Sequence, residues 1–360
     1  MDELENLEWC RMSSAIIPTD QPPNNPYAAQ QNLLIERLTF FLAALPPVLR
    51  ADVELALKEE GKLLSRSQTS TILPHTNLPA GSWSLLTLLV AQYVSPDIDV
   101  RWASCVAIAI ECFVCALDLL DDIEDNDQTP IVQALGEARV LNVSTALLAL
   151  AQSSILFLSQ LNVSTERIIQ LLQILQEATI AATGGQHRDL LAEQRPAQDL
   201  TFEECIEIAA GKAGSLMSLA CQLGAVCAKA DDHTCKQFAA LGELLGIAQQ
   251  LDNDSHDLYH LLQDYTSAAG LASHTKSGKT DLVRKKKTLP VVLAAGRDIT
   301  LHENAWTADK EIEAHRNALQ EGIITTWGIC LLYRERARDR LQEIEAQRPI
   351  TPLLGRLLGW

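Results

Sequence analysis

The sequence predicts an all-α protein built as a single-domain helical bundle. Three observations indicate this fold. Apolar residues recur at intervals of three and four along most of the chain, these segments are rich in Ala and Leu, and alternating β-branched runs and Asn-Gly or Asp-Gly turns are missing. Apolar residues make up 47% of the 360 residues and charged residues 21%, which is typical of a folded globular protein.

The helical elements are separated by short stretches that disfavour helix. Residues 1–30 are rich in Pro and Asn and show no period, so we predict an irregular N-terminal arm before a helical domain over residues 31–360. Pro-Pro, Ser-Pro and Gly-Gly pairs divide the domain, and a polar connection covers residues 267–287. The strongest helical patterns cover residues 103–117, 141–161, 168–183, 202–229 and 238–262.

The charge and cysteine content exclude some classes of function. A net charge of −17 argues against a protein that coats nucleic acid or an anionic membrane, because both need a basic surface. The most apolar stretch, residues 103–117, contains Glu111 and is followed by several aspartates, so it is predicted to be a buried helix and not a membrane span. Nine cysteines, most of them within apolar helical pattern, and a start without the order of a secretion signal predict a cytoplasmic protein with reduced thiols.

Four aspartates follow the apolar helix at helical spacing. Asp118 precedes Asp121 by three residues and Asp122 by four, and Asp125 follows Asp121 by four. These spacings place them on neighbouring positions of one helix face. Like charges so close repel one another unless protons or a cation neutralise them, and oxygen ligands favour a hard ion such as Mg²⁺. The stripe therefore predicts a metal site.

A second acidic stripe lies about 130 residues later on another helical segment. Asn253 and Asp257 are four residues apart, with Asp254 between them and Gln250 one turn before. Two acidic helix faces that meet across a bundle would hold metal ions between them. Either stripe alone would also suit a solvated helix end.

Lysines and polar residues provide for an anionic ligand. Lys212 is a lone cation in an apolar helical segment, and Lys286 belongs to a basic run, residues 284–287. Gln186 and Asp189 follow the Gly-Gly pair between helical segments. Metal ions and lysines together take up the charge that develops on a diphosphate leaving group.

Together these segments resemble the trans-prenyl diphosphate synthase family, the class I isoprenoid enzymes whose all-α fold surrounds a central active-site cavity. Within the family, the pattern around residues 118–126 and 212–216 is most similar to the ComQ-type prenyltransferases, which attach an isoprenoid to a tryptophan of a peptide pheromone precursor. The matching motifs, in the family's order, are Asp121-Asp122-Ile123-Glu124-Asp125, Gly185-Gln186 with Asp189-Leu190, Lys212-Ala213-Gly214, Gln250 with Asn253, Asp254 and Asp257, and Lys286-Lys287-Thr288-Leu289-Pro290.

The resemblance implies a prenyltransferase acting on an allylic prenyl diphosphate of C10 to C20 with a cluster of three Mg²⁺ ions, and it implies a homodimer. It assigns the metal to Asp121, Asp125, Asn253, Asp254 and Asp257. It assigns the diphosphate to Lys212, Lys286, Gln186, Gln250 and Asp189. Candidate catalytic residues are Asp118, Asp122 and Lys212, where Asp118 is either an extra base or ligand near the acceptor or a structural hydrogen-bond acceptor.

The departures from the family concern its second substrate. Members that elongate a chain with isopentenyl diphosphate carry a Gly-Gly-Lys-Arg-x-Arg-Pro segment before the aspartates and an Arg-Arg pair after them. Here the corresponding residues 78–86 and 126–130 contain no cation. A second diphosphate would then meet uncompensated repulsion, so we expect an acceptor other than isopentenyl diphosphate, either a peptide or a small molecule.

Two other interpretations stay open. A terpene synthase would quench the cation within a single substrate, although an aromatic content of 5% offers few ring faces to shield it. A conventional chain-elongating polyprenyl diphosphate synthase, or a non-catalytic subunit of one, is the further alternative.

Overall fold

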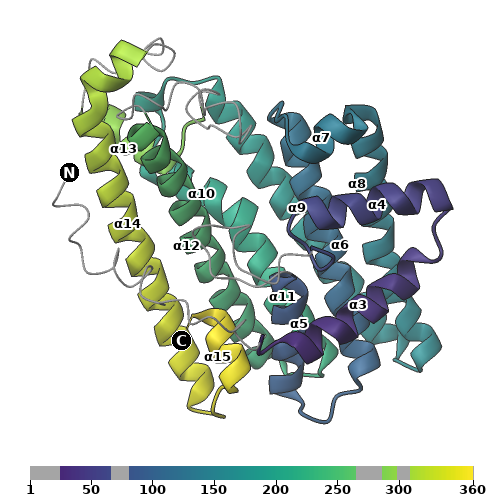
Figure 1. The fold of residues 1–360 in the computed structure, drawn as a ribbon. Coiled ribbons are helices and arrows are strands. Elements are labelled where there is room, and N and C mark those ends of the chain that lie inside the picture. The colour runs from purple at the N-terminus through teal and green to yellow at the C-terminus, as the bar shows by residue number, and fades with distance from the viewer. Residues whose placement is uncertain (1–24, 66–80, 265–285, 298–308, 360) are drawn as a thin grey trace, which may run out of the picture.

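The computed structural model describes residues 25–65, 81–264, 286–297 and 309–359, and within these ranges the chain is helical with no β-strand (Figure 1). The predicted all-α fold is therefore confirmed. In chain order the elements are α3 (Ala28–Leu42), α4 (Pro47–Glu59), α5 (Ser82–Val94), α6 (Val100–Glu124), α7 (Pro130–Leu135), α8 (Glu137–Leu156), the 3₁₀ turn η1 (Phe157–Leu161), α9 (Thr165–Glu193), the 3₁₀ turn η2 (Ala197–Asp199), α10 (Phe202–Ala209), the π-helical segment η3 (Ala210–Gly214), α11 (Ser215–Cys227), α12 (Asp232–Asp264), α13 (Leu289–Arg297), α14 (Asp309–Glu345) and α15 (Pro352–Leu358).

Two predicted segments fall largely outside the described residues. Residues 1–24 of the predicted N-terminal arm are among them, so its boundary near residue 30 stays a prediction. Residues 267–285 of the predicted polar connection are also outside the described part.

Helix α6 is the central helix of the main core. All residues from Ala103 to Ala116 are buried, which explains why this segment is apolar on every side. It packs against α5, α8 and α11. The side chain of Asp99 caps its first turn by accepting a hydrogen bond from the backbone N–H of Arg101 at 2.9 Å. The carboxylates at residues 118–125 follow this buried run, so they lie at the end of the core helix.

The helices of the C-terminal half complete the bundle. Helix α12 lies beside α14 along one side of the molecule and also packs on α11 (Figure 1). The helix predicted over residues 202–229 is formed as three pieces, because η3 interrupts it between α10 and α11. Segment η3 contacts both α9 and α12, and these contacts bring the polar residues of three elements together.

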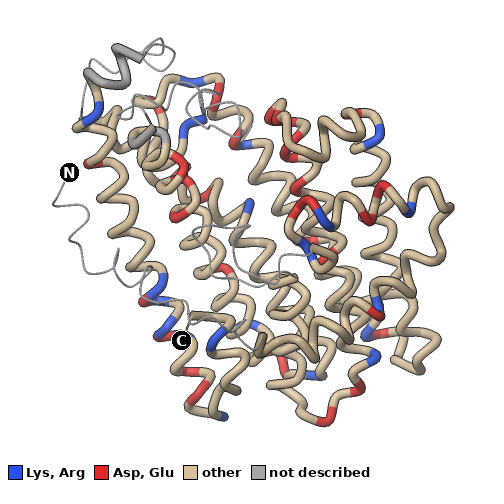
Figure 2. The backbone as a smooth tube through the Cα atoms, in the orientation of Figure 1, with Lys and Arg blue, Asp and Glu red and all other residues tan. Residues whose placement is uncertain are grey.

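The distribution of charge follows this packing. Figure 2 shows long uncharged stretches within the helices, with acidic and basic residues of both signs concentrated toward helix ends and connections. Two helices, α6 and α8, are long and apolar enough to cross a membrane, but 83% of the most apolar window of α6 is buried inside the bundle. The burial predicted for residues 103–117 is therefore confirmed, whereas only 44% of the α8 window is buried.

Candidate active site

The last turn of α6 and its C-cap residue each carry an aspartate that is paired with a lysine from another element. Asp121 Oδ1 lies 3.2 Å from Lys212 Nζ, and Asp125 Oδ2 lies 2.5 Å from Lys286 Nζ. Lys212 belongs to η3 and Lys286 lies just before α13, so the fold gathers charges that are far apart in the sequence. The side chains of Asp125 and Lys286 are only 2% and 10% exposed, so water screens this pair weakly, whereas Asp121 is 33% exposed in its pair with Lys212.

The close approach of α9 and η3 positions Lys212. Its Nζ atom also lies 2.7 Å from Asp189 Oδ2 on α9. A Cβ atom on Gly185 would lie 2.6 Å from the carbonyl carbon of Gly211, so the two backbones touch at a point where only glycine fits. Lys212 follows Gly211 within the π-helical segment, a type of irregularity that is frequent at functional sites.

The electrostatics of the cluster keep Lys212 charged. Burial alone would lower the pKa of its ammonium group, but the carboxylates of Asp121 and Asp189 outweigh burial and raise that pKa above its ordinary value. The opposite holds for Glu193, one turn after Asp189 on α9. Burial raises the pKa of Glu193, and the charges of Asp125 and Asp189 raise it further.

A pocket lies beside this cluster. Three lysines, two carboxylic acids and a glutamine contribute to its walls, so it combines cations with hydrogen-bonding groups. Helix α12 supplies Gln250 and Asp254, and the Gln250 amide donates a hydrogen bond to Asp254 Oδ1 at 2.9 Å. The pocket is lined by Asp189, Cys205, Ile208, Ala209, Lys212, Gln250, Asp254, Lys286, Lys287, Thr288 and Leu289.

The second acidic stripe is divided between the pocket and the surface. Asp254 and Gln250 share the pocket with Lys212, as described above. Asn253 and Asp257 are exposed, and Asn253 Oδ1 accepts a hydrogen bond from Gln249 Nε2 at 3.2 Å. Of the residues in this stripe, Asp254 is therefore the acid that the fold brings next to the lysines.

Three further predicted residues lie around this cluster. The buried carboxylate of Asp122 accepts a hydrogen bond from Thr129 Oγ1 at 3.0 Å, in the segment that follows α6. Asp118 forms an ion pair with Lys62. The amide nitrogen and oxygen of Gln186, next to Gly185, are buried and have no hydrogen-bond partner among the described residues.

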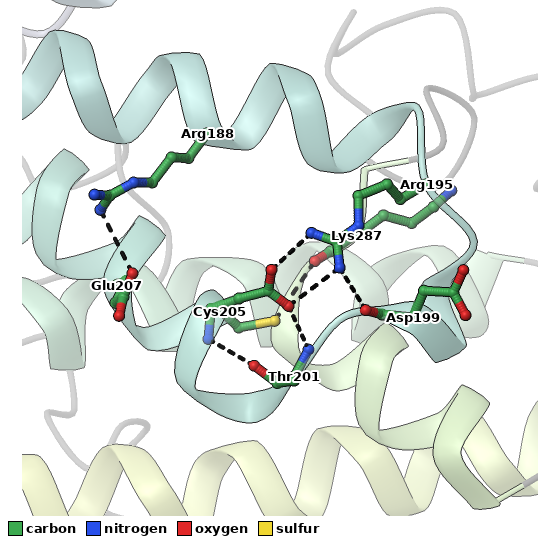
Figure 3. Close-up of polar contacts among 8 residues, drawn as sticks. Arg188, Arg195, Asp199, Thr201, Cys205, Glu207 and Lys287 are labelled. Carbon is green, nitrogen blue, oxygen red and sulfur yellow. Dashed lines mark hydrogen bonds and ion pairs between the residues drawn. The ribbon is translucent and has the colours of Figure 1, made fainter.

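Some residues of this region were missed from the sequence. Lys287 is buried and lines the pocket, and its carbonyl oxygen accepts a weak hydrogen bond from the Cys205 thiol (Figure 3). The basic run at residues 284–287 already pointed to it. Arg195 pairs with Glu204 at the start of α10, where Thr201 caps the helix. Figure 3 shows Arg195 and Thr201 close to Cys205 and Lys287. Lys62 was not among the residues selected from the sequence, and its ion pair with Asp118 is revealed by the fold.

The oxygen ligands suit Mg²⁺ bound together with a phosphate group. Among the described residues, no group of three or more His, Cys, Asp or Glu side chains is arranged to hold a metal ion by itself. Mg²⁺, however, is usually held by one or two carboxylates, with water and substrate phosphates completing its shell. Asp121 and Asp125, one helical turn apart, provide such a pair, and Asp254 lines the adjoining pocket.

The all-α fold is the one that solved isoprenoid synthases have. A solved geranylgeranyl pyrophosphate synthase superposes with a TM-score of 0.70 at 19% identity, over 92% of this chain and 98% of that one. The polyprenyl synthetase family matches residues 83–321, so the chain belongs to this family. The family expected from the sequence motifs is therefore confirmed.

Curated relatives of two kinds match the chain. A (2E,6E)-farnesyl diphosphate synthase of Mycobacterium tuberculosis is 31% identical over 54% of this chain and 50% of its own length. The tryptophan prenyltransferase ComQ of Bacillus spizizenii is 29% identical over 50% of this chain and 54% of its own length. The chain thus spans about half the length of the curated relatives it matches.

Proposed function

We propose that this protein is a Mg²⁺-dependent prenyltransferase that ionises an allylic prenyl diphosphate and transfers the prenyl cation to an acceptor other than isopentenyl diphosphate. The observation that carries the proposal is the pairing of Lys212 and Lys286 with Asp121 and Asp125 beside one pocket. Cations and acidic metal ligands from distant segments meet there, which is the arrangement that a departing diphosphate requires.

The lysines would bind the diphosphate and stabilise its charge. Lys212, Lys286 and Lys287 line the pocket, and the Gln250 amide adds a hydrogen-bond donor. As the bond between C1 and the diphosphate oxygen breaks, negative charge grows on the leaving group, so nearby cations favour the transition state over the bound substrate. Asp189 would orient Lys212, because the two are paired at 2.7 Å.

Asp121 and Asp125 would be the direct ligands of Mg²⁺, with Asp254 in the wall of the adjoining pocket. Bound with the diphosphate, Mg²⁺ would neutralise charge on its oxygens. Asn253 and Asp257 would complete the metal set, as the family resemblance implies. Asp122 would help to position the neighbouring ligand Asp121, because its carboxylate accepts a hydrogen bond from Thr129.

The acceptor is inferred from missing positive charge. Residues 81–86 and 126–130 contain no Lys or Arg, and the latter segment instead buries Asp127. A second diphosphate would lack partners there. The similarity to a protein named tryptophan prenyltransferase supports an indole-bearing acceptor, either a peptide or a small molecule.

Chain elongation is the second candidate function. The relatives named farnesyl and geranylgeranyl diphosphate synthase favour it, being 31% and 30% identical over their matched regions. These names refer to prenyl diphosphate products of C15 and C20, which lie within the C10 to C20 range expected for the donor from the sequence.

Two further features concern the protein in the cell. Ile169 and Ile180 are exposed on α9, and a separation of eleven residues places them on one helix face, so we propose that this face forms the interface of a homodimer.

The eight cysteines of the described part of the chain are free and buried, which supports a cytoplasmic location.

The test is incubation with geranyl, farnesyl and geranylgeranyl diphosphates and Mg²⁺, with isopentenyl diphosphate, indole or a tryptophan peptide as acceptor. We expect diphosphate release from at least one donor and a prenylated indole by mass spectrometry. Release from none of the donors under any of these conditions would refute the proposal. Elongation by isopentenyl diphosphate alone would favour the second candidate.

A further inference from the structure

Asp118 lies on the same face of α6 as Asp121 and Asp125, one turn nearer to the middle of the helix. A separation of three residues corresponds to about 4.5 Å along the helix axis. Asp118 forms an ion pair with Lys62, which lies in the turn after α4. The Lys62 side chain is 9% exposed and that of Asp118 is 37% exposed. The carboxylate is therefore accessible, while the cation that holds it is covered.

A buried glutamate fixes the turn that carries Lys62. Glu111, two turns before Asp118 on α6, is fully buried. Its Oε1 atom accepts a hydrogen bond from the backbone N–H of Leu63 at 2.8 Å, and its Oε2 atom accepts one from the backbone N–H of Ser84 at 3.1 Å. One side chain thereby ties the turn after α4 and the first turn of α5 to the core helix. This arrangement fixes the backbone next to Lys62.

The charge balance of this cluster disfavours a second anion. Burial would lower the pKa of Lys62, but Asp118 and Glu111 together raise that pKa above its ordinary value, so the lysine stays protonated. Its charge is matched by Asp118, and no other Lys or Arg occurs in residues 60–65, 81–86 and 118–130. A diphosphate would meet carboxylates here, whereas a neutral group with a hydrogen to donate would meet a suitable acceptor.

We propose that Asp118 accepts the proton that the acceptor molecule must lose, and that Lys62 is a positioning residue that holds the carboxylate in place. This inference rests on the proposed function. The acceptor is then a neutral nucleophile bearing N–H or C–H, such as an indole, and not a second diphosphate.

The chemistry of this step balances. The bond between C1 and the diphosphate oxygen breaks, and its electron pair leaves with the diphosphate. A carbon or nitrogen of the acceptor donates an electron pair to C1 and forms the new bond. The proton on that same atom passes to the Asp118 carboxylate, and solvent later removes it. General base catalysis of this kind contributes about 10²- to 10⁴-fold to a rate.

The first experiment measures how the prenyl cation is partitioned. Wild type, Asp118→Asn, Lys62→Met and Lys62→Arg are incubated with farnesyl diphosphate, Mg²⁺ and N-acetyl-tryptophanamide, and the farnesylated product and farnesol are quantified. We expect the ratio of farnesylated product to farnesol to fall about 10²-fold in Asp118→Asn. It should also fall in Lys62→Met and recover in part in Lys62→Arg.

A matched control removes a similar ion pair elsewhere. Asp52 on α4 pairs with Arg139 on α8, outside the candidate active site, so Asp52→Asn should leave the product ratio unchanged. An unchanged ratio in Asp118→Asn would overturn the inference, since a purely structural pair would lower both products together. Formation of farnesol alone by wild type would overturn it as well.

The second experiment does not depend on turnover. Isopentenyl diphosphate is titrated calorimetrically into wild type that is saturated with Mg²⁺ and the unreactive thiolo analogue of farnesyl diphosphate. We expect no saturable binding of isopentenyl diphosphate to wild type, because the charge of Lys62 is already paired with Asp118. Tight binding would overturn the inference. Failure of the proposed function is a different result, namely no diphosphate release from any allylic donor.

Discussion

Lys286 Nζ lies 2.5 Å from Asp125 Oδ2, and both side chains are buried. This contact joins the start of the segment that leads into α13 to the end of α6. The cation proposed to bind diphosphate is therefore paired with the carboxylate proposed to bind Mg²⁺. When diphosphate and Mg²⁺ bind, the Lys286–Asp125 pair has to separate, so that Lys286 contacts the diphosphate and Asp125 contacts Mg²⁺.

Lys286→Met should strongly slow diphosphate release. The substitution keeps the length of the side chain but removes the charge that offsets negative charge on the leaving group. Loss of one such stabilising contact typically lowers kcat by about 10²- to 10³-fold. The measurement is the steady-state release of diphosphate from farnesyl diphosphate. Lys236→Met, on the exposed part of α12, is the matched control and should retain the wild-type rate. Equal rates in the two variants would contradict the role of Lys286.

Mg²⁺ and diphosphate should strengthen each other's binding. Each ligand alone has to separate Lys286 from Asp125, whereas both together give each residue a new partner. The coupling should raise the affinity for Mg²⁺ by about 10-fold or more when inorganic pyrophosphate is present. Calorimetric titration of Mg²⁺ with and without pyrophosphate measures this factor. Equal affinities in the two titrations would refute the exchange of partners.

The sequence predicts the helices and their polar ends better than it predicts how the helices pack against one another. The apolar run of α6 and the acidic stripe that follows it are local patterns, and both are present in the structure. The spacing of Asn253 and Asp257 also predicts a shared face, but helical spacing cannot tell which side of that face meets the pocket. Packing against η3 and α14 decides that, and it brings Asp254 inward.

Two features of the site depend on contacts between distant segments. The break at residues 210–214 accompanies the approach of Gly185 to Gly211, which periodicity within one helix does not reveal. Lys62 lies in a turn, and its partner Asp118 is 56 residues away. Glu111 is conspicuous in the sequence because it interrupts an apolar run. The sequence does not predict that its carboxylate accepts hydrogen bonds from the backbone N–H groups of Leu63 and Ser84.

Gly185→Ala should destabilise the protein and reduce diphosphate release. The added Cβ would lie 2.6 Å from the Gly211 carbonyl carbon and 2.7 Å from the Lys212 backbone nitrogen, so α9 and η3 would have to separate. Overpacking of this kind usually costs about 1–3 kcal/mol of unfolding free energy. The neighbouring Gly184 has open space around its Cβ position, so Gly184→Ala is the control. It should be as stable as wild type or more stable, because Ala favours helix. Equal loss of stability in both variants, measured by urea unfolding, would argue against the close approach.

Glu193 should make stability depend on pH. The pKa of its carboxyl is raised above the ordinary 4.5, first by burial and then by Asp125 and Asp189. A raised folded-state pKa means that the folded protein binds this proton more tightly than the unfolded chain. The resulting stabilisation is full below pH 4.5 and is lost as the pH rises through the higher folded-state value. Glu193→Gln keeps the shape without the charge, so its gain in unfolding free energy over wild type should be larger at pH 7.5 than at pH 4.5. Urea unfolding without Mg²⁺ at both pH values tests this, and a gain that does not change with pH would contradict it.

The exposed face of α9 provides the last prediction. Ile169 and Ile180 are 49% and 74% exposed and lie on one side of the helix. Covering them with a second protein surface would remove apolar area from water, which is favourable. Ile180→Lys should place a charge in that interface and convert the dimer to a monomer, which sedimentation equilibrium measures directly. Ile324→Lys, at a 45% exposed position on α14, provides a matched control that should leave the dimer intact. A wild-type protein that is monomeric at all concentrations would refute the interface, and dissociation caused equally by both substitutions would assign it to no particular face. Because the pocket is lined by α9 through Asp189, loss of the dimer should also lower diphosphate release, and the extent of that loss would show how far the interface supports the site.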